Sequence, residues 1–202
     1  MVNIMYVLKE NLESELEIKK SKFLTKIYKL SSFQEIEEIL TRLKKKHPNA
    51  THICYAYRYE GNVRYSDDKE PSKTAGYPIL QVLEKQQLDH ILAVVIRYFG
   101  GIKLGANGLV RAYSTATTTA LEKKQLCTLK EGYLVQIICP YEKSKQLDYL
   151  LREKKNVQKI YQEQILYTFS IKTEEWETFQ EFHPTIQKRI LIEEEISSQE
   201  NK

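Results

Sequence analysis

A glycine-rich stretch, Arg97 to Tyr113, constrains the fold of this 202-residue chain more than any other feature. It reads RYFGGIKLGANGLVRAY and carries four of the chain's seven glycines. An apolar run at 91–96 precedes it, and helix-forming sequence at about 107–123 follows it. A buried strand that enters a glycine loop and then a helix predicts an anion site, because loop and first-turn N–H groups converge there.

The predicted anion-binding set combines these four glycines with the cations around them. Its members in this stretch are Arg97, Gly100, Gly101, Lys103, Gly105, Gly108 and Arg111. The glycine spacing matches neither the GxGxxG pattern of dinucleotide-binding proteins nor the P-loop pattern, so the stretch does not predict an NTPase. The alternative is that the glycines serve tight turns and close packing between helix and strand.

An unusual loop, SDDKEPSKTAGYP at 66–78, lies before this stretch in the sequence. Asp67, Asp68 and Glu70 are three acids within four residues, and such carboxylates can bind Mg²⁺ or act as acid and base. Adjacent carboxylates also fix turns and helix starts through hydrogen bonds to the backbone. Because no histidine or further acid clearly completes a site, we predict loop fixing, with no catalytic residue, no metal and no cofactor.

His52 opens an aromatic segment, HICYAYRY at 52–59, which has the composition of a strand. We predict that His52 is a partly buried hydrogen-bonding group, with a place in a functional site as the alternative. The tyrosines and arginines of this segment and of the glycine stretch suit base stacking and phosphate contact. Alternation along a strand places about half of them in the core, so the sequence leaves the exposed set open.

Charge is spread unevenly along the chain. Residues 1–131 carry 21 Lys/Arg against 15 Asp/Glu, whereas residues 132–202 carry 10 against 12. The basic part contains the glycine stretch, which points to a polyanionic partner. No apolar run reaches the roughly 18 residues that cross a bilayer, and the first residues do not resemble a signal peptide. The three cysteines fit neither a disulfide framework nor a zinc site. We therefore expect a cytoplasmic protein with no membrane partner.

Hydrophobic periodicity predicts two domains, both with helices and strands. The first, 1–130, is predicted to have strands at 12–18, 23–30, 52–59, 63–65 and 88–96, a helix capped by Ser32 and Glu35, and helices at about 74–85 and 107–123. The pattern restarts near Gly132. The second, 131–202, is predicted to have strands at 133–139, 157–162, 164–173 and 189–196, with helices at 142–154 and 174–182. This βαββαβ order is the ferredoxin-like pattern.

Three segments together resemble the YigZ/IMPACT family, which includes YvyE-like bacterial two-domain members. They are His52, SDDKEPSKTAGYPIL at 66–80 and VVIRYFGGIKLGANGLVRAY at 94–113, and the resemblance extends over the whole chain. It implies an α+β fold in which an N-terminal domain is similar to domain 2 of ribosomal protein S5. The C-terminal domain is implied to be ferredoxin-like, similar to the C-terminal domain of elongation factor G.

The resemblance also implies a surface built from the family's motif positions. These are His52, Asp67, Asp68, Glu70, Pro71, Thr74, Ala75, Gly76 and Tyr113. The family usually has glycine where Lys69 and Lys73 stand here. If those positions need a positive φ, a residue other than glycine costs about 1 kcal/mol there. The two lysines place cations beside the acidic loop, which favours contact with an anion or RNA over a metal site.

We predict a non-enzymatic protein that associates with RNA or the ribosome, in translation or its regulation. Phosphate contacts are expected from Lys69, Lys73, Arg97, Lys103 and Arg111. One alternative is an enzyme or phosphate-ligand binder that uses Asp67, Asp68 and Glu70. Another is a protein-interaction module, because eukaryotic relatives of the first domain are similar to translation regulators that bind a protein partner.

Overall fold

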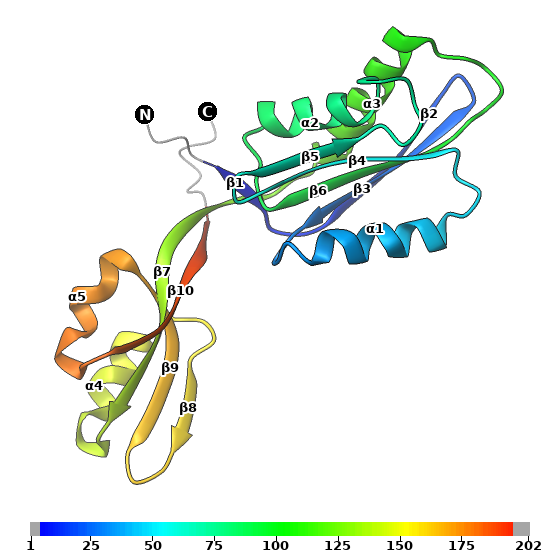
Figure 1. Ribbon diagram of the computed structural model, residues 1–202. Helices are drawn as coiled ribbons and strands as arrows, with labels where there is room; N and C mark the ends of the chain where they lie inside the picture. The colour runs from blue at the N-terminus through cyan, green and yellow to red at the C-terminus, as the bar shows by residue number, and fades with distance from the viewer. Residues whose placement is uncertain (1–4, 196–202) are drawn as a thin grey trace. The chain divides into compact units, whose positions relative to one another are not determined.

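The computed structural model describes residues 5–195, which divide into two compact units, 5–128 and Leu129–Glu195. Each unit combines antiparallel strands with helices, as the α+β prediction required (Figure 1). The division falls close to the predicted boundary near residue 130. Among the helices of residues 5–195, none has both the length and the apolar character needed to cross a membrane.

Unit 1 is organised around a five-stranded antiparallel sheet with the strand order β2-β3-β6-β4-β5. The strands are β2 (Leu12–Ile18), β3 (Ser21–Lys29), β4 (His52–Tyr59), β5 (Asn62–Ser66) and β6 (Ile91–Tyr98). The central strand β6 is buried from Ile91 to Arg97, because helices cover both faces of the sheet. Its continuous apolar run is typical of a strand without a solvent-facing side.

Three helices form the outer layers of unit 1. Helix α1 (Glu35–Lys46) covers one face, while α2 (Gly76–Lys85) and α3 (Ala106–Leu121) cover the other. The predicted capping box at Ser32 is wrong: the helix begins at Glu35, and its N-cap, Gln34, makes no side-chain cap. The Glu35 carboxylate instead accepts a 3.3 Å hydrogen bond from the Ser31 N–H. A short strand that the sequence did not predict, β1 (Tyr6–Leu8), pairs with residues 126–128.

Unit 2 has the predicted βαββαβ order, with the sheet order β10-β7-β9-β8. Its elements are β7 (Leu126–Cys139, which begins in unit 1), α4 (Tyr141–Leu151), β8 (Gln158–Tyr161), β9 (Ile165–Lys172), α5 (Trp176–Phe179) and β10 (Thr185–Glu195). The single helix predicted at 174–182 is wrong. Short 3-10 turns, Thr173–Glu175 and Gln180–Phe182, flank a four-residue α5. Phe179 and Phe182 nevertheless pack into the core with β7, β9 and α4.

Four loops of unit 1 meet at one end of its sheet, which we call the loop end: residues 19–21, 47–52, 66–76 and 99–105. The strand register requires this, because Arg97 of β6 lies opposite both Phe23 and His52. The 66–76 loop joins them through a 2.8 Å contact between His52 Nδ1 and the Asp68 carbonyl oxygen. The two sequence motifs are therefore neighbours in space.

Candidate functional site

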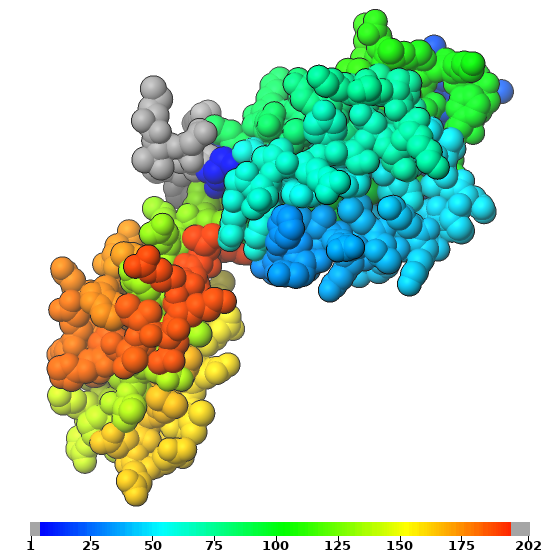
Figure 2. Space-filling view, viewed as in Figure 1, coloured from blue at the N-terminus to red at the C-terminus, as the bar shows by residue number. Residues whose placement is uncertain are grey.

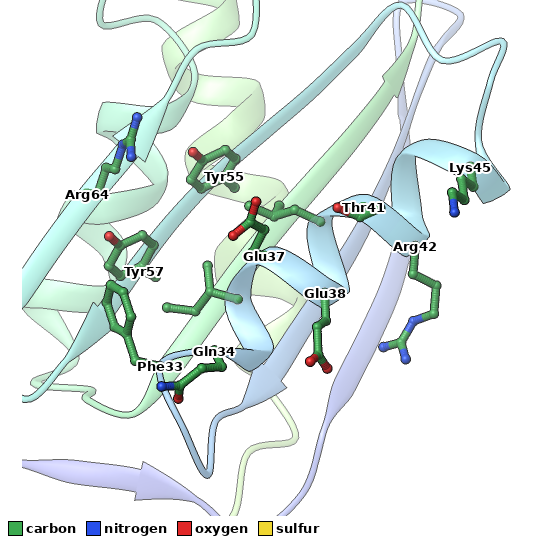
Figure 3. Close-up of a pocket in the computed structure, with 12 residues that line it drawn as sticks. Phe33, Gln34, Glu37, Glu38, Thr41, Arg42, Lys45, Tyr55, Tyr57 and Arg64 are labelled. Atoms are coloured by element: carbon green, nitrogen blue, oxygen red, sulfur yellow. The ribbon is translucent and has the colours of Figure 1, made fainter.

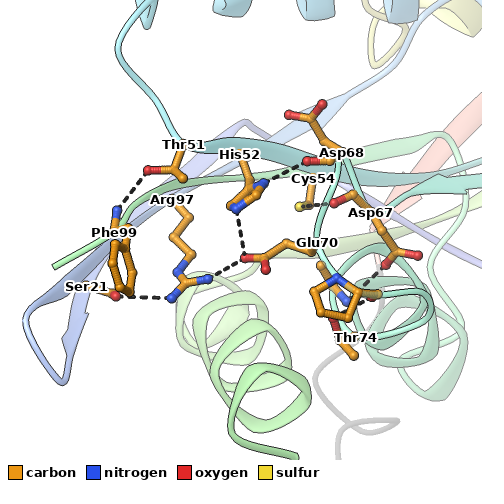
Figure 4. Close-up of polar contacts among 12 residues, drawn as sticks. Ser21, Thr51, His52, Cys54, Asp67, Asp68, Glu70, Thr74, Arg97 and Phe99 are labelled. Atoms are coloured by element: carbon orange, nitrogen blue, oxygen red, sulfur yellow. Dashed lines mark hydrogen bonds and ion pairs between the residues drawn. The ribbon is translucent and has the colours of Figure 1, made fainter. Parts of the chain in front are cut away.

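A buried ion pair links the two motifs at the loop end. One guanidinium nitrogen of Arg97 lies 2.5 Å from Glu70 Oε1, and the two side chains are only 5% and 4% exposed (Figure 4). The Tyr113 hydroxyl donates to the same oxygen at 2.8 Å. The second guanidinium nitrogen of Arg97 donates to Ser21 Oγ at 3.3 Å. Loss of one member of a buried pair leaves an uncompensated charge, so this pair ties the 66–76 loop to β6.

His52 belongs to the same network as a hydrogen-bonding group, as predicted. Because its Nδ1 contacts a backbone carbonyl, that nitrogen must carry a proton. Its Nε2 lies 3.7 Å from Glu70 Oε1, and the side chain is mostly buried. The ring therefore lies between the backbone of the 66–76 loop, which its Nδ1 contacts, and the carboxylate of Glu70, which its Nε2 faces.

The aspartates of the 66–76 loop are engaged with backbone N–H groups. Asp67 Oδ1 accepts from Ala75 and Gly76 at 3.0 and 2.8 Å, and its Oδ2 accepts from Lys73 at 2.8 Å. Asp68 Oδ2 accepts from Ile53 at 2.5 Å. Within residues 5–195, no group of three His, Cys, Asp or Glu side chains is arranged to hold a metal ion. These contacts favour the loop-fixing interpretation of the acids.

Cys54 lies beneath this loop and is a structural thiol. Its sulfur is 3.1 Å from the Asp67 carbonyl oxygen and 3.4 Å from the Tyr113 hydroxyl. Burial raises the pKa of the Cys54 thiol far above its ordinary value, and the charges of Glu70 and Asp68 add to the rise. A thiol that stays protonated is a poor nucleophile, so Cys54 serves packing.

Lys69 and Lys73 occupy left-handed backbone positions, with φ values of 68° and 61°. These are the positions where the family resemblance implies glycine, and lysine here takes a left-handed conformation that glycine adopts without strain. Both side chains are exposed. The Lys73 ammonium lies 6.0 Å from the centre of the Tyr77 ring. The strained lysines therefore present two cations to solvent at the loop end.

The glycine loop, residues 99–105, uses its glycines for two purposes. Gly101 and Gly105 have φ values of 85° and 72°, with open space around them. At Gly100, an added Cβ would lie 1.8 Å from the Lys20 carbonyl oxygen, so this glycine permits two backbones to touch. Gly105 is the N-cap of α3 and makes no side-chain cap. The loop is anchored by the N–H of Phe99 on Thr51 Oγ1 and that of Gly100 on Ser21 Oγ.

The structure corrects several of the predicted surface positions. Tyr113 and Ala75 are fully buried, and Glu70, Thr74 and Gly76 are buried as well. Arg97 is only 4% exposed and faces Glu70, so the prediction that it contacts phosphates directly is wrong. The predicted positions that are exposed are Lys69, Pro71, Lys73, Gly101, Lys103, Gly105 and Arg111.

Sequence reasoning missed part of the loop end. Phe99 and Ile102 are 45% and 41% exposed, and neither residue is among the predicted site positions. Lys19 and Lys20 are exposed in the β2–β3 turn, where both have positive φ values. The one sequence signal for Lys19 and Lys20 is their place between the strands predicted at 12–18 and 23–30.

The family comparison covers the part of the chain that contains this site. Residues 19–121 match the Impact N-terminal domain, so the chain belongs to the IMPACT family. Among curated relatives, IMPACT family member YvyE of Bacillus subtilis is 46% identical over 124 residues. That match covers 60% of this chain and 57% of the relative, so the chain spans little more than half the length of this relative.

A Thermus thermophilus relative matches over more of its own length. This IMPACT family member, encoded in the pol 5′ region, is 39% identical over 135 residues, which cover 67% of this chain and 74% of the relative. A solved structure, described as the crystal structure of a hypothetical protein, is similar with a TM-score of 0.62 at 26% identity. The alignment covers 98% of this chain and all of that one.

Proposed function

We propose that this protein is a non-enzymatic cytoplasmic protein that binds RNA on the ribosome and acts in translation or its regulation. The observation that carries the proposal is the set of exposed side chains at the loop end: Lys19, Lys20, Lys69, Lys73 and Lys103, with Phe99 and Ile102 beside them. Lysines in this number suit phosphate contacts. An exposed phenylalanine offers a face on which an unpaired base stacks.

The contacts of the carboxylates support this function over an enzyme. In a metal-assisted or acid–base mechanism, a carboxylate must be available to the metal or the substrate. Here Asp67 and Asp68 accept hydrogen bonds from backbone N–H groups, and Glu70 accepts them from Arg97 and Tyr113. The buried Arg97 then acts through Glu70, by holding the 66–76 loop and its lysines beside the glycine loop. The names of the relatives do not say what those proteins bind. The binding experiment below therefore also tests for a protein partner in translation control.

Co-sedimentation of the full chain with ribosomes over a salt series tests the proposal. We expect the logarithm of the binding constant to fall linearly with the logarithm of salt concentration, with a slope of about −0.7 to −0.9 per phosphate contact. The variant Lys69→Ala/Lys73→Ala/Lys103→Ala removes three loop-end cations. Lys143→Ala/Lys145→Ala/Lys188→Ala removes three exposed cations from unit 2 as a charge-matched control.

The first variant is expected to flatten the slope by up to about 3, and the control to leave it nearly unchanged. Binding that is absent at low salt, or that both variants weaken equally, would contradict an RNA site at the loop end. A pull-down on the full chain followed by nuclease treatment separates the candidates, because a ribosomal protein that the chain binds stays bound and an RNA contact is lost.

The finer fold names are part of the same proposal. In unit 2, β7 lies between β9 and β10, with α4 and the α5 region packed on one face, which supports a ferredoxin-like domain. Unit 1 is proposed to resemble domain 2 of ribosomal protein S5. Superposition of each unit on those domains tests the assignment, and a TM-score below about 0.5 would overturn it.

A further inference from the structure

A groove lies away from the loop end, between α1 and the β4–β5 hairpin. It has a volume of about 1020 Å³, and apolar groups of Phe33, Leu40, Tyr55 and Tyr57 line it (Figure 3). Phe33 is 45% exposed, although its ring packs edge to face on the Tyr57 ring with the ring centroids 5.8 Å apart. The surfaces of α1 and of the hairpin lie next to one another on one face of unit 1 (Figure 2). The sheet face beside α1 is therefore incompletely covered.

The edge of the sheet beside this groove has free hydrogen-bonding groups. Among the described strands, β5 pairs only with β4. Their two-residue turn, Glu60-Gly61, has positive φ at both positions and closes on the Tyr59–Asn62 pair. A two-residue turn closes on a hydrogen-bonded pair, and such pairs alternate along an antiparallel ladder. The N–H and C=O groups of Val63 and Tyr65 therefore point away from β4, toward an empty strand position.

The charges around the groove indicate what fits it. Arg64 of β5 lines the groove opposite Tyr57, and Arg42 and Lys45 line its α1 side. Within residues 5–195, none of these three cations makes an ion pair with a carboxylate. Glu37 and Glu38 on α1 also line the groove and would repel a phosphate backbone. The combination favours an extended protein segment with an acidic residue over RNA.

We infer that β5 and this groove receive an extended segment of another protein, which adds to the sheet as a sixth strand. Backbone groups of the segment pair with Val63 and Tyr65, as in other cases of strand addition. Alternate side chains of a strand point to one face, so every second residue of the segment enters the groove. A large apolar side chain fills the space beside Tyr57 and Leu40, and an acidic neighbour on the same face pairs with Arg64.

A displayed library of random twelve-residue peptides, selected on the full chain, provides the probe. We expect enrichment of proline-free peptides with a large apolar and an acidic residue two positions apart. The selected peptide is then titrated by fluorescence anisotropy against Val63→Pro, which removes one outward N–H from an edge where proline is tolerated. Affinity is expected to fall at least tenfold. Val63→Thr, which keeps the N–H, is expected to stay within about twofold of the wild type.

Charge reversal tests the orientation in the groove. Arg64→Glu is expected to weaken the peptide about fivefold, and replacing the peptide's acid with lysine is expected to restore binding to that variant. The exposed Lys145→Glu in unit 2 is the control and is expected to change nothing. No enriched peptide, or a peptide that Val63→Pro binds as tightly as the wild type does, would overturn the inference.

Amide exchange on the wild-type chain keeps the test valid where Val63→Pro fails to fold. The bound peptide is expected to slow exchange at Val63 and Tyr65, and unchanged exchange there would also overturn the inference. Ribosome binding serves as a further readout: Arg64→Glu is expected to leave it intact, since the loop end carries the proposed RNA site. Ribosome binding that Arg64→Glu abolishes would assign the groove to RNA instead.

Discussion

The 66–76 loop and the 99–105 loop lie at the same end of unit 1, yet they are built in opposite ways. Carboxylates fix the first, with Asp67 holding three backbone N–H groups and Glu70 holding Arg97. The second has two side-chain anchors, Thr51 and Ser21, and exposes most of its residues. The 66–76 loop has the residue types of a metal or catalytic site but uses them to hold its own backbone in place. The 99–105 loop has no carboxylates and stays largely exposed to solvent.

This difference separates two kinds of residue that are mixed in the sequence. The charged groups that look most like a site, Glu70 and Arg97, are buried and neutralise one another. The charges that meet solvent are lysines, such as Lys69, Lys73 and Lys103. Function at the loop end is therefore expected to respond to exposed lysines, and stability to the buried acids and arginine.

The largest expected effect comes from breaking the link between the loops. Arg97→Ala leaves Glu70 buried without its cation, so we expect the free energy of unfolding to fall by about 3–5 kcal/mol. Urea unfolding measures this. Lys103→Ala in the open loop is the control, expected within about 0.5 kcal/mol of wild type. Equal losses of unfolding free energy in Arg97→Ala and Lys103→Ala would contradict a special role of the buried ion pair in stability.

Removal of the loop's internal anchor is expected to have the next largest effect. Asp67→Ala deletes the acceptor of three backbone N–H groups. Because hydrogen bonds to charged groups contribute about 1.5–3 kcal/mol each and do not add fully, we expect a loss of about 2–4 kcal/mol. Thermal unfolding with and without Mg²⁺ provides the measurement. Stabilisation of the wild type by Mg²⁺, lost in Asp67→Ala, would contradict the loop-fixing role.

The elements of both units could be predicted from sequence because their periodicity is strong and local. The buried run of β6 and the βαββαβ order of unit 2 are examples. The start of α1 was wrong because Ser32 had the chemistry of a cap, while the backbone turned into the helix only after Gln34. The short α5 region was wrong because aromatic spacing suited one helix, although the chain forms separate turns.

The composition of the site was harder to predict because it depends on pairing between distant residues. No residue near Arg97 in the sequence indicates that the Glu70 carboxylate accepts hydrogen bonds from both Arg97 and Tyr113. A cation beside glycines looks like an anion-binding residue until the register brings a carboxylate to it. The groove beside α1 was also missed, because it depends on which tyrosines of β4 the helix leaves uncovered.

Two glycines test whether close backbone contact or helix packing fixes the glycine loop. In Gly100→Ala the new Cβ would overlap the Lys20 backbone, so the strand turn must move, and we expect a loss of about 2 kcal/mol. Gly108→Ala, in the first turn of α3, brings the new Cβ to 3.2 Å from the Cβ of Leu104 in the preceding loop. The gain in helix propensity, about 1 kcal/mol, offsets that contact. We expect a change within about 0.5 kcal/mol, and denaturant titration of both variants checks the contrast.

The strained lysines are expected to change stability less than Gly100 does, and in the opposite direction. Lys69→Gly/Lys73→Gly relieves two left-handed residues, and we expect a gain of about 1 kcal/mol in total, because glycine's greater freedom in the unfolded chain offsets part of the relief. Lys69→Ala/Lys73→Ala removes the same charges but keeps the strain, so its stability should equal that of the wild type. Both variants should flatten the salt dependence of ribosome binding by up to about 2. If only the glycine variant changes binding, the loop's conformation matters rather than its charge; if neither does, the lysines lie outside the interface.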